Sequence, residues 1–71
     1  MEKLKRYRQF RGLSRACLAE FVGISAETLA RYERGDREPN TTTTKRLAAV
    51  LNVTPNELLG VEEGTEEKEG R

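Results

Sequence analysis

Residues 26 to 31 carry hydrogen-bonding and apolar groups that match the edges of nucleic-acid bases. Glu27 can accept a hydrogen bond from a cytosine amino group, and Arg31 can donate a forked pair to guanine or to a phosphate. Ala26 offers a methyl group for contact with a thymine methyl, and Thr28 adds a hydroxyl. An acidic residue in the first turn of a helix also complements the helix dipole, so Glu27 has a structural alternative.

The residues needed for catalysis or metal binding are missing. With no His and one Cys, the chain lacks the usual zinc-ligand sets and cannot form an internal disulfide. No His is present to activate a nucleophile, and there is no glycine-rich phosphate loop. Glu27 and Glu33 lie six positions apart on one predicted helix and point to different sides. We therefore expect no enzymatic activity, no metal and no cofactor.

Two short amphipathic helices joined at a glycine would position these groups. Residues 15–22 and 26–34 show helical apolar periodicity, and Ser14 and Ser25 precede them as N-cap candidates. Gly23 lies between them, where a sharp turn needs a conformation that glycine adopts at little cost. This is the helix-turn-helix arrangement, whose second helix lies in the DNA major groove.

Three further helices are predicted around this unit. They cover residues 2–11, residues 41–51 and a short segment that begins at Pro55. Thr54 and Glu57 have the spacing of a capping box around that proline.

The order and spacing of four segments are similar to those of the phage-repressor (Cro/Xre-type) helix-turn-helix family. The segments are LKRYRQFRGLS (4–14), LAEFVGIS (18–25), YERGDREPN (32–40) and LAAVLNVTPNELLG (47–60). The similarity covers about residues 3–60. It implies an all-α, compact five-helix lambda-repressor-like DNA-binding domain that binds double-stranded DNA, usually as a homodimer on a two-fold-related site.

The family pattern assigns roles to individual residues. Base-reading positions at the start of the helix 26–34 are Ala26, Glu27, Thr28 and Arg31. Beside the family position Arg15, residues at helix starts and around the turn at Gly35 are expected to contact the DNA backbone, and the full set is Ser14, Arg15, Ser25, Arg34, Arg37 and Thr41. Arg15 replaces the usual glutamine and opposes the helix dipole, which favours a phosphate contact over an idle solvated arginine. Arg8 and Glu33 match an arginine and a glutamate that form a structural ion pair; the alternative is two independent surface charges.

Thr41 to Thr44 depart from the family, which usually has leucines at the first and fourth of these positions. Threonine is a weak helix former, so this first turn is expected to be marginal. Its hydroxyls and free amides could also hold a DNA phosphate, and the two interpretations are compatible.

Several apolar residues have two possible uses. Phe10, Cys17 and Phe21 replace residues that are usually polar, and they either extend the core, which we favour, or form a patch for a partner. Cys17 as a redox sensor is a weaker alternative. Dimerisation is expected through the last two helices, where the apolar residues are Val53, Leu58, Leu59 and Val61.

The charge is divided unevenly along the chain. Residues 1–61 carry eleven Lys/Arg and seven Asp/Glu, a balance of +4, whereas residues 62–71 carry two and five, a balance of −3. The latter segment has no apolar residue, so we expect a helix-turn-helix domain over 1–61 and a disordered acidic tail over 62–71. The tail would be a solubilising overhang or the start of a linker, rather than a DNA mimic.

The sequence thus predicts a sequence-specific DNA-binding transcriptional regulator, a repressor, that reads the major groove with its third helix. Without an apolar leader or a long apolar stretch, it is expected to be soluble and cytoplasmic. The alternative is a protein-interaction module with the same fold, such as an antitoxin.

Overall fold

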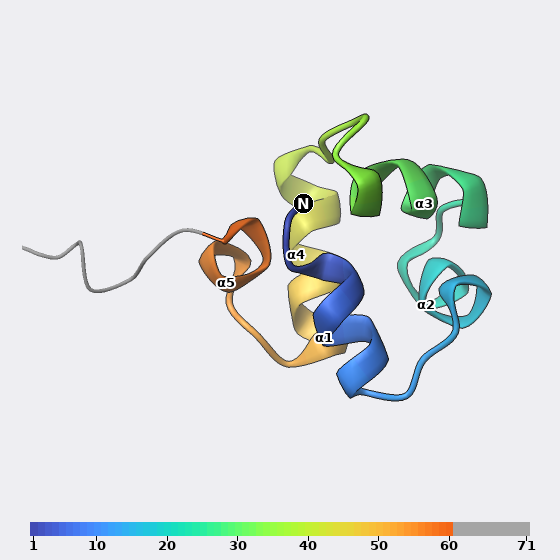
Figure 1. The fold of residues 1–71 in the computed structure, drawn as a ribbon, viewed down its shortest axis with the longest axis horizontal. Helices are drawn as coiled ribbons and strands as arrows, with labels where there is room; N and C mark the ends of the chain where they lie inside the picture. The colour runs from blue at the N-terminus through green and yellow to red at the C-terminus, as the bar shows by residue number, and fades with distance from the viewer. Residues whose placement is uncertain (61–71) are drawn as a thin grey trace, which may run out of the picture.

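The computed structural model describes residues 1–60, which form five helices and, within that range, no strand (Figure 1). The helices are α1 (Leu4–Phe10), α2 (Arg15–Val22), α3 (Ala26–Arg34), α4 (Thr41–Leu51) and α5 (Pro55–Leu59). The expected all-α, five-helix fold is therefore confirmed. No helix among these residues is both long enough and apolar enough to cross a membrane.

Four of the helices begin at a side-chain cap. In each case the side-chain oxygen of the cap accepts a hydrogen bond from the backbone amide three residues later, at 2.8 to 3.1 Å. The caps are Ser14, Ser25, Asn40 and Thr54. Glu57 completes the capping box by accepting from the Thr54 amide at 2.7 Å. These caps satisfy amides that have no partner inside a helix, which is why the predicted bounds of α2, α3 and α4 are correct.

The first helix is shorter than predicted. It covers Leu4–Phe10 instead of residues 2–11, and no side chain caps its start. The α-ammonium group of Met1 donates a hydrogen bond to the Tyr32 carbonyl oxygen at 2.6 Å, and the Met1 side chain is buried in the core. This contact draws the first residues onto α3, so they turn before the helical spiral begins.

The turn between α2 and α3 has the geometry that the glycine predicts. Gly23 has φ of +87°, and its amide donates to the Ala19 carbonyl oxygen at 2.8 Å. Ala19 is buried, and Ile24 packs against the core directly after the turn. A left-handed residue at this point ends α2 and lets α3 start in a new direction.

The core is built on one leucine from each helix, with a second from α4. The six fully buried side chains are Leu4, Leu18, Leu29, Leu47, Leu51 and Leu58. Helix α4 packs against α2 on one side and α5 on the other, and α1 contacts α3 and α5 (Figure 1). Because Leu29 of α3 is part of this core, the core fixes the position of α3.

The threonine run is fully helical. Helix α4 begins at Thr41, and the last of the four threonines, Thr44, is buried and donates its hydroxyl proton to the Asn40 carbonyl oxygen at 2.8 Å. That bond satisfies the hydroxyl where the family usually has a leucine. The expected fraying at this turn is therefore opposed by the Asn40 cap and by a buried hydrogen bond.

Two expectations about apolar residues are wrong. Phe10 and Phe21 are 77% and 65% exposed, so they do not extend the core; Cys17 is half-buried. Counting 100° per residue, Phe10 lies about 140° and Phe21 about 110° from the centre of the buried residues of its helix, so both point away from the core. Leu58 is fully buried, so it is a core residue and not dimer surface, whereas Leu59 is 42% exposed. Val61 and the segment 62–71 lie outside the described residues.

Candidate nucleic-acid interface

The residues expected to contact DNA lie on the surface. All of them are exposed except Thr28, which is half-buried. Their accessibility is a requirement for binding, and the structure meets it. Their contacts in the free protein differ from residue to residue and decide what each could offer a ligand.

The start of α3 holds two linked hydroxyls. Ser25 accepts from the Thr28 amide at 3.0 Å, and the two side-chain oxygens are 2.9 Å apart. One hydroxyl proton is used in that link, so the other remains available for an external acceptor. The first turn of α3 thus keeps one donor free beside the exposed methyl of Ala26.

Glu27 and Arg31 form an ion pair on the outer side of α3. An Nη2 of Arg31 donates to Glu27 Oε2 at 3.0 Å, and both side chains are largely exposed. Such i, i+4 pairs are worth about 0.3–0.5 kcal/mol, so a ligand can rearrange the pair at low cost. Glu27, the expected acceptor from cytosine, and Arg31, the expected donor to guanine, are therefore bonded to each other in the free protein. The i, i+4 spacing of the two residues on one helix is the sequence signal that points to this contact.

The expected ion pair between Arg8 and Glu33 is present and buried. Arg8 Nε donates to Glu33 Oε2 at 2.6 Å, with side-chain exposures of 9% and 2%. Arg8 Nη1 also donates to the Leu13 carbonyl oxygen at 2.8 Å. Arg8 therefore ties α1, the α1–α2 loop and α3 together, which fixes the angle of α3 against the core.

Arg15 joins this pair from the start of α2. Its Nε and Nη2 donate to Glu33 Oε1 at 3.3 and 3.2 Å. This contact was not foreseen, because residues eighteen positions apart give no periodic signal. A glutamate at the edge of a core stripe, facing one arginine already, was the only available indication.

Arg34 and Arg37 flank the turn after α3, and they differ in whether an acidic side chain already neutralises them. Arg34 Nε donates to Asp36 Oδ2 at 2.9 Å, in an exposed pair. Arg37 is exposed, and within residues 1–60 it makes no ion pair. Arg37 is thus the better placed of the two to attract a phosphate.

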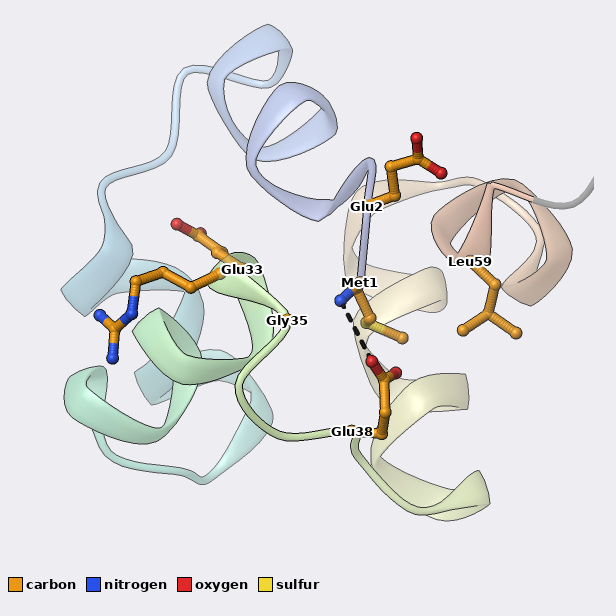
Figure 2. A pocket seen from close by; sticks show the side chains of 7 residues that line it. Met1, Glu2, Glu33, Gly35, Glu38 and Leu59 are labelled. Atoms are coloured by element: carbon orange, nitrogen blue, oxygen red, sulfur yellow. Dashed lines mark ion pairs between the residues drawn. The ribbon is translucent and has the colours of Figure 1, made fainter.

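A hollow beside this turn has the wrong charge for nucleic acid. It has a volume of about 390 Å³ and is lined by Met1, Glu2, Glu33, Arg34, Gly35, Glu38 and Leu59 (Figure 2). The Met1 ammonium lies 3.7 Å from Glu38 Oε2, and the Glu2 side chain lies nearby. The three carboxylates of the lining face Arg34 and the Met1 ammonium, and Glu33 is already paired with Arg8 and Arg15, so the hollow has no surplus positive charge to attract a phosphate.

Thr41 lies apart from the α3 residues, at the edge of a second hollow. This hollow of about 270 Å³ is lined by Pro39, Thr41, Thr44, Lys45, Pro55 and Leu59. Lys45 is its single charged residue, so the start of α4 is weakly basic.

Comparison with known proteins identifies the family to which this chain belongs. The helix-turn-helix family model HTH_3 matches residues 4–58. The SPbeta prophage-derived uncharacterized HTH-type transcriptional regulator YonR of Bacillus subtilis (strain 168) is 36% identical over 58 residues, which are 82% of this chain and 54% of YonR. From the same organism, the HTH-type transcriptional regulator ImmR is 35% identical over 68 residues, 96% of this chain and 54% of ImmR.

A third relative is shorter. The uncharacterized HTH-type transcriptional regulator YazB of B. subtilis is 32% identical over 56 residues, 79% of this chain and 81% of YazB. The chain thus spans about half the length of YonR and ImmR. No solved structure matches it. With its glycine-turned α2–α3 unit inside a five-helix core, the chain belongs to the Cro/Xre-type helix-turn-helix family.

Proposed function

We propose that this chain is a sequence-specific DNA-binding transcriptional regulator that acts as a repressor in the cytoplasm. The observation that carries the proposal is the exposed first half of α3, which presents donors and acceptors while its other side is locked into the core. A rigid helix with polar groups at its start suits insertion into the major groove. The names of its relatives as transcriptional regulators support the same function.

In the proposed complex, α3 reads bases and the residues around it hold phosphates. Base contacts come from Ala26, Glu27, Thr28 and Arg31. Phosphate contacts come from Ser14, Arg15, Ser25, Arg34, Arg37 and Thr41. Since phosphate contacts fix the register and base contacts carry the sequence information, the two groups have separable effects on binding.

The proposed active species is a homodimer on a two-fold-related site. Leu59 is the exposed apolar residue of α5, and it borders the hollow beside α4. Pairing of two chains through this region would present two copies of α3 to half-sites about 10 base pairs apart, or a multiple of that spacing.

Selection of bound duplexes from a random DNA library tests the function directly. We expect the full chain to enrich a two-fold-related motif. Arg31→Ala, which removes an exposed side chain, should fold normally but lose discrimination at one position of each half-site. Failure of the wild-type chain to enrich any motif would contradict the proposal.

Phe10 and Phe21 support a second candidate function. Two largely exposed phenylalanines on a short chain are suitable anchors for a protein partner. An antitoxin-like interaction module would keep the same fold without reading DNA. A wild-type chain that binds no duplex, even at low salt, would favour this alternative.

A further inference from the structure

Glu33 is bonded to two arginines at once, and its two oxygens are divided between them. Oε2 accepts from Arg8 Nε at 2.6 Å, whereas Oε1 accepts from Arg15 Nε and Nη2 at 3.3 and 3.2 Å. Oε1 also lies 3.5 Å from Arg8 Nη2. The three side chains come from α1, α2 and α3, so one carboxylate connects all three helices.

The charge of this triad is not balanced. Two guanidinium groups face one carboxylate, which leaves one positive charge. Arg8 and Glu33 are 9% and 2% exposed, whereas Arg15 is 44% exposed. The surplus charge therefore reaches solvent at Arg15, while the buried pair neutralises itself.

The geometry of Arg15 leaves one of its edges free. A guanidinium can make paired hydrogen bonds along its side edge, through Nε and Nη2, or along its end edge, through Nη1 and Nη2. Glu33 occupies the side edge. Within residues 1–60, Nη1 donates to no protein acceptor, so the end edge remains available to an anion such as a phosphate.

We infer that Glu33 is a positioning residue for DNA binding, which holds Arg15 so that its end edge meets a backbone phosphate. This inference rests on the proposed DNA-binding function. The ion pair with Arg8 anchors the carboxylate, and the carboxylate in turn restricts the guanidinium of Arg15 before DNA binds. Ordering a long side chain in advance reduces the entropy lost on binding. An acidic residue thereby strengthens the binding of a polyanion.

Glu33→Gln tests the inference, because the two explanations predict opposite changes in affinity for DNA. If Glu33 were only a negative charge near DNA, its removal would raise affinity. Positioning predicts the reverse, a loss of roughly three- to tenfold for a labelled random-sequence duplex, with the salt slope shallower by up to about 0.9. Glu20→Gln is the matched control, because Glu20 is exposed on α2 and makes no hydrogen bond within residues 1–60. It should bind like the wild type or slightly tighter.

Thermal unfolding followed by circular dichroism verifies that each variant is folded at the temperature of the binding assay. A folded Glu33→Gln variant that binds as well as the wild type, or better, overturns the inference. In an Arg15→Ala background the same change should have no further effect on affinity, and a persistent loss there would also overturn it.

If Glu33→Gln does not fold, Arg15→Lys tests whether Glu33 positions Arg15. Arg15→Lys keeps the charge but cannot hold Glu33 and a phosphate with two edges, so we expect weaker duplex binding and unchanged stability. In the free wild-type protein, the Arg15 Nε–H nuclear magnetic resonance signal should be protected from solvent exchange. Wild-type affinity for Arg15→Lys, or rapid exchange of that signal, would count against positioning. Loss of duplex binding by the wild type itself would instead contradict the proposed function.

Discussion

Among single residues, Arg8 connects α1 both to the α1–α2 loop and to α3. Its guanidinium donates to Glu33 and to the Leu13 carbonyl oxygen from a nearly buried position. A buried charge that loses its partner keeps the desolvation penalty without the compensating attraction. The cost of mutation at Arg8 should therefore greatly exceed that at arginines on the surface.

Arg8→Ala should lower the free energy of unfolding by about 3 kcal/mol, the lower part of the range for a broken buried pair, because Arg15 still neutralises Glu33. Urea denaturation measures this change. Arg6→Ala, an exposed arginine of the same helix, should stay within about 0.5 kcal/mol of the wild type. Equal losses for the two variants would mean that the buried pair contributes nothing specific.

Glu27 is expected to determine one base of the recognised site. Glu27→Gln replaces an acceptor of a cytosine amino proton by a side chain that pairs with adenine, so preference at that position should move from C towards A. The expected change is about 1–3 kcal/mol at that base pair. Site selection with both proteins measures it. An identical motif with only a higher overall affinity would show that Glu27 serves the helix dipole and its pair with Arg31.

The structure contains the predicted ion pair beside the candidate site and adds a partner that the sequence did not predict. The family pattern anticipated the pairing of Arg8 with Glu33, and the structure brings the two side chains together. The contact of Arg15 with the same carboxylate could not be predicted, since it depends on how α2 and α3 cross. Pairing across helices depends on angle and rotamer, which one-dimensional spacing does not encode.

At the level of elements, the α2–α3 turn depends on one backbone conformation. Gly23 has φ of +87°, and a Cβ placed there would meet only Arg46 Nη1 at 4.0 Å. A substitution is therefore penalised by the left-handed backbone and not by a clash.

Gly23→Ala should destabilise the protein by about 1–2 kcal/mol, the cost of a left-handed L-residue. Gly23→Asn should lose less, because asparagine tolerates this conformation better. Thermal unfolding of the two variants tests the order. A larger loss for asparagine than for alanine would place the cost in side-chain packing instead.

Helix limits were predictable wherever a local bond sets them. The cap candidates Ser14 and Ser25 gave the starts of α2 and α3 correctly. The start of α1 was not predictable, since it depends on the contact between the Met1 ammonium and Tyr32, thirty-one positions away. A cap that bonds three residues along the chain can be predicted from the sequence, whereas a contact between distant residues can be predicted only once the fold is known.

In the whole molecule, positive charge around α3 should set the salt dependence of DNA binding. Arg37→Ala should weaken binding to all sequences alike and make the slope of log affinity against log salt shallower by about one unit. Arg34→Ala should have a smaller effect, because Asp36 already neutralises that arginine. Measuring affinity over a salt series distinguishes the two. An unchanged slope for Arg37→Ala would remove it from the interface.

Dimerisation should depend on the exposed side of α5. Leu59→Asp places a charge on a side chain that is 42% exposed, so the fold should persist while self-association is lost. Sedimentation analysis gives the oligomeric state, and circular dichroism confirms the fold. Phe21→Asp is the control on α2, and it should leave the oligomeric state unchanged. Loss of the dimer in the control alone would move the interface to α2.

The leucine core also gives the molecule a built-in set of spectroscopic reporters. Every helix contributes at least one fully buried leucine, while Leu13 and Leu59 lie nearer the surface. Methyl isotope labelling of this single residue type would place a probe in α1, α2, α3, α4 and α5 at once. Titration with a duplex could then separate movement of Leu29 beneath the reading helix from movement of Leu58 beneath the proposed dimer surface, without adding a label that perturbs packing.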